Sequence, residues 1–259
     1  MPRVRRERPR ETWLALASRL SPVLVAVSLA GWILLFTLDR GTRSAPLCLS
    51  YETLSGTVQG LLWIAFAANP PSVVVLTWLA MLVAMMSPLL TRPVGHLWLG
   101  SPERRRRRAV ALFVLGYFAV WMTAGLALLI VAAALGLFAG ELGLSALTIA
   151  AALAALWQAG PLRQRALNHC HRMPAMSASG TAADRDCIRF GATHGLWCAA
   201  TCSPLMLLPL TSPAFHLPLM FVVSVWLVLE RMGPPRHPCW TIRLLPGQAV
   251  AATLLKSIR

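Results

Sequence analysis

Charged side chains are scarce in this sequence, and acidic ones are the scarcest. The 259 residues include 9 Asp and Glu against 24 Lys and Arg, and charged residues make up 13% of the chain. Soluble domains carry about 25% charged residues, so this composition excludes an ordinary soluble protein. With 57% hydrophobic residues, the chain is predicted to be an integral membrane protein. Its basic residues fit membrane topology and anionic lipid better than nucleic acid, since they lie between apolar runs.

Sequence motifs of common enzymes are absent as well. The chain holds no acidic pair, nucleophile elbow, phosphate-binding loop or dinucleotide fingerprint. Haem would need two axial histidines that face each other across the bundle. Only His194 lies clearly inside a predicted helix, so the sequence argues against haem. The sequence therefore favours a role other than catalysis.

The apolar runs predict an all-α fold, a polytopic membrane bundle of six transmembrane helices. The six segments are residues 21–38, 72–91, 109–138, 143–160, 191–210 and 214–231. Residues 1–20 form a basic N-terminus, 21–231 the transmembrane domain, and 232–259 a basic tail. Residues 61–68 and 249–255 are apolar but too short to span a bilayer, and the first piece is expected at the interface or against the bundle.

The distribution of charge agrees with six crossings. All but two of the 24 basic residues fall on one side of the membrane, the exceptions being Arg40 and Arg43. Basic loops mark the cytoplasmic face, so both termini are predicted to be cytoplasmic. The run that begins at Arg104 and ends at Arg108 lies on this face and is expected to bind anionic lipid headgroups. Cys48 stands alone on the outer side, which argues against a disulfide framework.

One stripe of soft ligands runs along the fifth predicted helix. Four residues separate each of its members from the next: His194, Cys198, Cys202 and Met206. This spacing places them on one slowly drifting helix face. Imidazole, thiolate and thioether are ligands that Cu(I) or Zn(II) accepts, although the same side chains also serve ordinary helix packing. The stripe spans about 18 Å, so one ion would take an adjacent pair and further ligands from another helix.

Two ligand sets are open for such an ion. Met81 and Met85 on the antiparallel second helix lie at depths that match Cys202 and Cys198, which would suit copper. Alternatively, His194 and Cys198 would meet Glu230 near the inner surface, which would suit zinc.

A second group of ligands lies in the fourth predicted loop. His169, Cys170 and His171 are consecutive there, and adjacent residues do not share a helix face. The group is either a solvated loop or a transient docking point for metal on its way to the stripe.

Several segments together resemble domain-of-unknown-function family 2182, a bacterial family described as predicted metal-binding integral membrane proteins. The resemblance is carried by WLAMLVAMMSP at 78–88, Gly116-Tyr117 with Trp121, WQAGPLR at 157–163, His169-Cys170, His194-Gly195 with Cys198, Cys202, Leu205 and Met206, and Glu230-Arg231. It covers roughly residues 71–231. The chain departs from the family at Ala166 and Thr201, where the family tends to have Cys, and at Ser203, where it tends to have Trp.

The resemblance implies a multi-pass protein of the bacterial inner membrane that binds metal. Together with the stripe, it favours a protein that binds copper for handling or transport and that has a metal-delivery protein or membrane complex as its partner. A structural or assembly subunit of a membrane complex, with the stripe serving only packing, is the alternative. A membrane redox enzyme that uses bound copper is a third option.

Overall fold

The computed structural model describes residues 9–41, 71–177 and 179–241, and within the first range it describes the side chains of residues 22–38. This part of the chain is built from helices without a strand, which confirms the all-α class. The helices in order are α1 (Pro9–Gly41), α3 (Pro71–Met86), η2 (Ser87–Leu90), α4 (Thr91–Gly100), η3 (Glu103–Arg105), α5 (Arg106–Glu141), α6 (Ala146–Ala159), α7 (Pro161–Cys170), α8 (Gly180–Leu210), η4 (Pro213–Phe215) and α9 (His216–Met232). Cys48 and the apolar pieces 61–68 and 249–255 lie outside the described residues.

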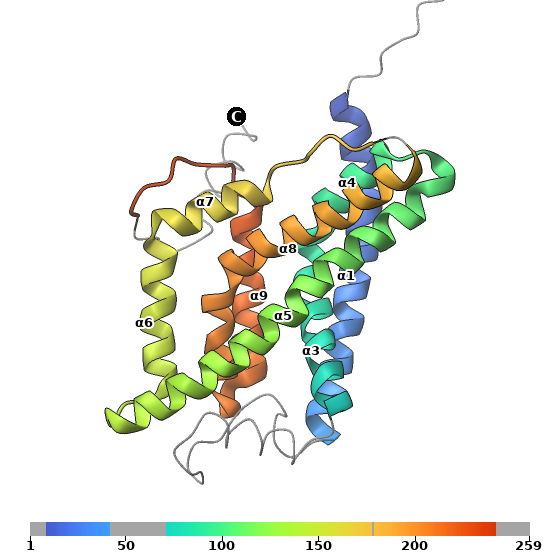
Figure 1. The fold of residues 1–259 in the computed structure, drawn as a ribbon. Coiled ribbons are helices and arrows are strands. Elements are labelled where there is room, and N and C mark those ends of the chain that lie inside the picture. Colours follow the sequence, from blue (N-terminus) through green and yellow to red (C-terminus); the bar gives the residue numbers. More distant parts are fainter. Residues whose placement is uncertain (1–8, 42–70, 178, 242–259) are drawn as a thin grey trace, which may run out of the picture.

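The long helices form one bundle around α8 (Figure 1). Among the described helices, α5 and α8 make the most extensive contact, and α7, α6 and α9 also pack on α8. The pair α1 and α3 covers one side of this centre, and α6 lies on the opposite side. The start of α1 and the segment that follows α9 lie at the same end of the bundle, which is the upper end in Figure 1.

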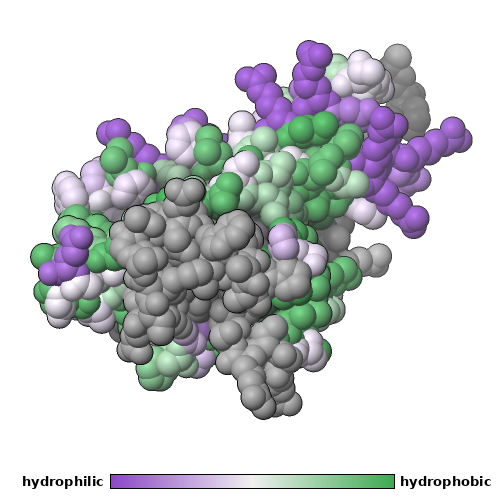
Figure 2. Space-filling model, turned by 60° about the horizontal axis from the view of Figure 1, so that its bottom comes forward, coloured by the Kyte–Doolittle hydropathy of each residue, from purple (hydrophilic) through white to green (hydrophobic). Residues whose placement is uncertain are grey.

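The flanks of the bundle are apolar. Large hydrophobic side chains are exposed on several helices, including Leu115 and Leu156 at 62% and Phe221 at 59%. Figure 2 shows hydrophobic residues over much of the surface, with hydrophilic residues gathered toward its upper right. Such broad apolar exposure is unfavourable in water and fits a lipid environment.

Three helical stretches are long and apolar enough to cross a membrane. They are Pro71–Gly100, Glu103–Glu141 and Pro213–Met232, and Pro22–Leu38 and Ala146–Ala159 are shorter apolar helices. The first stretch shows that the predicted helix 72–91 extends further. It continues through the 3-10 turn at Pro88, and α4 then runs on to Gly100. The count of six crossings and the side of each terminus stay predictions.

The fourth predicted loop, residues 161–190, is largely helical in the structure. Pro161 begins α7 at a position where the missing N–H of proline costs nothing. The second half of the segment belongs to α8, which begins at Gly180, and the φ of +78° at this residue suits glycine. His169 and Cys170 therefore lie in the last turn of a helix, and His171 is its cap.

Candidate metal centre

Glycines allow α5 and α8 to approach closely beside the predicted stripe. A Cβ atom at Gly191 would collide with the carbonyl of Phe113, and one at Gly116 would collide with the carbonyl of Ile188. Small residues at such crossings are typical of membrane helices, because backbones can then pack directly. The close crossing brings Tyr117 of α5 against the middle of α8.

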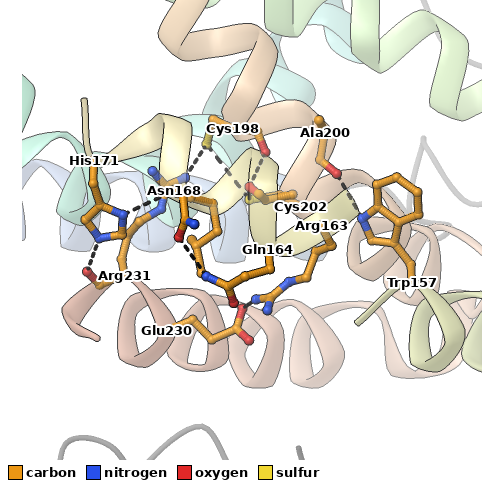
Figure 3. Close-up of polar contacts among 12 residues, drawn as sticks. Trp157, Arg163, Gln164, Asn168, His171, Cys198, Ala200, Cys202, Glu230 and Arg231 are labelled. Carbon is orange, nitrogen blue, oxygen red and sulfur yellow. Dashed lines mark hydrogen bonds and ion pairs between the residues drawn. The ribbon is translucent and has the colours of Figure 1, made fainter. Parts of the chain in front are cut away.

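The centre of the site is a pair of buried thiols. The Sγ atoms of Cys198 and Cys202 lie 3.9 Å apart, and each residue is 1% exposed. The hydroxyl of Tyr117 donates to Cys198 Sγ at 3.3 Å, and the guanidinium of Arg231 donates to the same sulfur at 3.2 Å. Figure 3 shows Arg231 of α9 reaching this sulfur. Two donors on one sulfur favour its thiolate form, because hydrogen bonds to the charged form stabilise it.

Arg231 is the positive charge of the site. Its carbonyl oxygen lies 3.3 Å from His171 Nε2, which ties the end of α9 to the end of α7. Its guanidinium also interacts with the thiol of Cys170. In the part of the chain that the structure describes, no carboxylate pairs with Arg231. The thiols of Cys198 and Cys170, which contact the guanidinium, are therefore the groups that can balance its charge as thiolates.

Burial changes the protonation of two groups at the end of α7. It raises the pKa of the Cys170 thiol to about 11, and the Arg231 guanidinium acts in the opposite direction. Burial also lowers the pKa of His171, against the effect of the Leu167 and Arg231 carbonyls. Cys170 is thus a neutral thiol at neutral pH, and a metal would have to displace its proton.

A buried ion pair holds α7 against α9. Arg163 donates to Glu230, and their side chains are 1% and 5% exposed. On the same helix, Gln164 donates to Asn168 at 2.8 Å, and Asn168 donates to the carbonyl of Arg236 at 2.7 Å. Figure 3 shows the contacts of Arg163 with Glu230 and of Gln164 with Asn168. Glu230 therefore has a structural partner, and its predicted role as a metal ligand stays untested.

A cavity of about 510 Å³ lies between α8 and the chain around the end of α7. His169, Met173 and His194 are among its lining residues. His169 stacks on Trp197, with ring centroids 4.2 Å apart. His194 is 4% exposed, and its Nε2 atom has no hydrogen-bond partner among the described residues. On α8, His194 lies one helical turn before Cys198.

The predicted methionines are buried and come from two different helices. Met206 is fully buried one turn beyond Cys202 on α8. Met81 and Met85 are fully buried on α3, which packs mainly on α1. They share one hydrophobic core with the cysteines. Their service as ligands stays a prediction.

The structure adds two site residues that the sequence reasoning did not select as functional. Tyr117 and Arg231 come from α5 and α9, and only the packing of these helices on α8 reveals their contact with Cys198. A sequence signal for Tyr117 is that the chain holds only 2 tyrosines. Within the described residues, no group of three or more His, Cys, Asp or Glu has the geometry to hold an ion. A metal would therefore bind through the thiol pair itself or after a local shift.

Comparison with known proteins gives one match. A family model described as PpoB2, copper chaperone, matches residues 75–255. No curated protein and no solved structure matches the chain. The match supports a metal-related family, although it does not carry the name of the family that the sequence resembles. Since it covers well over half of the sequence and includes the thiol pair, the chain belongs to the PpoB2 copper chaperone family.

Proposed function

We propose that the protein is a membrane-embedded copper chaperone that holds Cu(I) between Cys198 and Cys202. The observation that carries the proposal is the buried pair of sulfurs 3.9 Å apart, one of which accepts hydrogen bonds from both Tyr117 and Arg231. Thiolate is a preferred ligand of Cu(I). The membership in a copper chaperone family supports the choice of metal.

Charge balance supports the same choice. Two thiolates and one Cu(I) carry a net charge of minus one, and a buried net charge is costly unless it is paired. The guanidinium of Arg231, which lacks a carboxylate partner among the described residues, offsets that charge. Zinc through His194, Cys198 and Glu230 is the weaker alternative, because Glu230 is engaged by Arg163.

We place the access route for copper in the cavity of about 510 Å³, whose lining residue His194 lies one helical turn before Cys198. His169, Met173 and His194 offer two imidazoles and a thioether there, and His194 Nε2 has no partner within the described part of the chain. Copper would pass from these weaker ligands to the thiolates. Cys170 is a relay ligand in this scheme, since its raised pKa makes it a poorer thiolate than a soft metal site requires for tight binding.

The three methionines are assigned a supporting role. Met206, Met81 and Met85 extend soft, polarisable surface through the same core as the thiols. They would accept copper that leaves Cys202 toward the other end of the bundle. The recipient is a metal-accepting protein or a membrane complex.

We place the chain in the bacterial inner membrane, with six crossings and cytoplasmic termini. The charge pattern of the sequence supports this arrangement. The return of the described chain to the end of the bundle where α1 starts supports an even number of crossings. The resemblance to domain-of-unknown-function family 2182 lies largely within the matched range, and we propose that the two families describe one group of proteins.

The arginine run is assigned two roles. Arg105 and Arg108 both donate to Asp184 at the start of α8, the second at 2.6 Å. Arg104 and Arg107 are exposed and are assigned to anionic lipid headgroups. Replacing Arg104 and Arg107 by Gln should weaken binding to anionic vesicles and leave the fold intact. Unchanged vesicle binding would remove the lipid role.

Metal analysis tests the function directly. The protein is purified in mild detergent from cells grown with copper, and the copper content is compared for the wild type, a Cys198→Ala/Cys202→Ala variant and a Cys239→Ala control. We expect copper in the wild type and the control, because Cys239 is exposed whereas Cys198 and Cys202 are buried, and a loss in the double variant. Wild-type copper in the double variant would contradict the proposal and favour a structural subunit whose cysteines serve packing.

A further inference from the structure

A second cavity, of about 590 Å³, opens between α6, α8 and α9. It is lined by four alanines of α6, leucines of α8 and valines of α9. Its size falls within the range of about 300–1,000 Å³ that is typical of small-ligand sites. The cavity forms because α6 presents alanines to α8 and α9, so the helices leave space that larger side chains would fill. It is distinct from the cavity that His169 and His194 line, since the two share no lining residue.

Two polar side chains line this apolar space without a hydrogen-bond partner among the described residues. The amide nitrogen and oxygen of Gln158 are buried and form no hydrogen bond with the described residues, and the same holds for the indole nitrogen of Trp226. Both residues line the cavity, one from α6 and one from α9. Buried polar atoms are nearly always hydrogen-bonded in native proteins, because an unpaired one is costly. Their position indicates a ligand that supplies the missing partners.

The cavity is polar at one end and apolar along the rest. Gln158 lies at the end of α6, next to the turn into α7, and Trp226 lies one turn before Glu230, which binds α7 through Arg163. The lining then continues away from α7 to Ala151 and other small apolar residues. Trp side chains are enriched at the membrane interface, where lipid ester groups lie.

We propose that this cavity binds one membrane phospholipid. Its acyl chain lies along the alanines of α6, and an ester carbonyl accepts hydrogen bonds from Gln158 Nε2 and Trp226 Nε1. The amide oxygen of Gln158 accepts from a hydroxyl or ammonium group of the same lipid. The proposal is independent of copper binding, because none of these residues belongs to the thiol site.

The test measures phospholipid that stays bound to the full-length protein. The protein is purified in mild detergent, and bound lipid is quantified by native mass spectrometry. Ala155→Phe fills the cavity from an exposed position on its wall, and Leu156→Phe is the matched control, since Leu156 is 62% exposed and is not a lining residue. We expect Ala155→Phe to lose the lipid and Leu156→Phe to keep it. Copper content should be unchanged in both variants.

Two further variants test the polar contacts without filling the cavity. Gln158→Leu and Trp226→Phe each remove hydrogen-bonding groups, and each should reduce bound lipid several-fold. If Ala155→Phe fails to fold, these two variants decide the question. Equal lipid in Ala155→Phe and Leu156→Phe, or in Trp226→Phe and the wild type, would overturn the proposal.

A competing occupant is the tail of the same chain. Thr241 N donates to the carbonyl of Ala159 at 3.1 Å, so residues 242–259 follow directly from the polar end of the cavity. A photocrosslinking residue at position 155 separates the two cases. Capture of phospholipid supports the proposal, whereas capture of peptide from 242–259 in its place would refute it.

Discussion

The buried ion pair between Arg163 and Glu230 gives the most quantitative prediction. Its side chains are 1% and 5% exposed, so water does not screen the charges. Two unit charges about 4 Å apart attract each other by about 4 kcal/mol at an effective dielectric constant of 20. Glu230→Gln keeps the shape but leaves Arg163 charged and buried. We expect this variant to lower the free energy of unfolding by about 3–5 kcal/mol.

The control variants separate charge from packing. Arg163→Met should cost less than Glu230→Gln, because a carboxyl group left alone can take up a proton, whereas a guanidinium keeps its charge. The double variant Arg163→Met/Glu230→Leu should recover most of the loss, since well-packed apolar residues replace buried ion pairs at little cost. Unfolding is followed by tryptophan fluorescence as denaturing detergent is titrated into micelles. A loss below about 1 kcal/mol for Glu230→Gln would show that the pair is solvated and would refute this account of how α7 is held.

Three further predictions concern packing, thiol chemistry and topology. Gly191→Ala should destabilise the bundle by about 1–3 kcal/mol, because its methyl group would collide with the Phe113 carbonyl, whereas Gly140→Ala has open space and should be tolerated; thermal unfolding compares the two. At pH 8, iodoacetamide should modify a variant that retains only Cys239 much faster than one that retains only Cys170, because burial raises the pKa of Cys170 to about 11 and keeps it a neutral thiol; equal rates would contradict this. Reporter fusions after Leu38 and after Arg108 should report opposite sides of the membrane, and the same side for both would refute the six-helix topology.

The sequence predicts the helical class because its apolar runs are long enough to cross a bilayer as helices. It also places Cys198 and Cys202 on one helix face, and their sulfurs lie 3.9 Å apart. Hydropathy does not reveal α7, because this helix is polar on average. A helical pattern is nonetheless present, since Arg163, Leu167 and Cys170 are all buried and are spaced by four and three residues.

The contacts that complete the site could not be predicted from spacing along one helix. Tyr117 is separated from Cys198 by 81 positions in the chain, and Arg231 by 33. Such contacts depend on which helices cross and at what angle. Gly191 allows the close crossing, but a glycine in the sequence does not indicate which helix will pack against it. The pairing of Glu230 with Arg163 likewise follows from the existence of α7.

Copper K-edge X-ray absorption of the purified, copper-loaded protein tests the central claim most directly. The account predicts Cu(I) with sulfur as its nearest neighbours and a change of this signal when Cys198 and Cys202 are replaced. Copper surrounded by nitrogen and oxygen alone, or a signal that the double variant leaves unchanged, would contradict it.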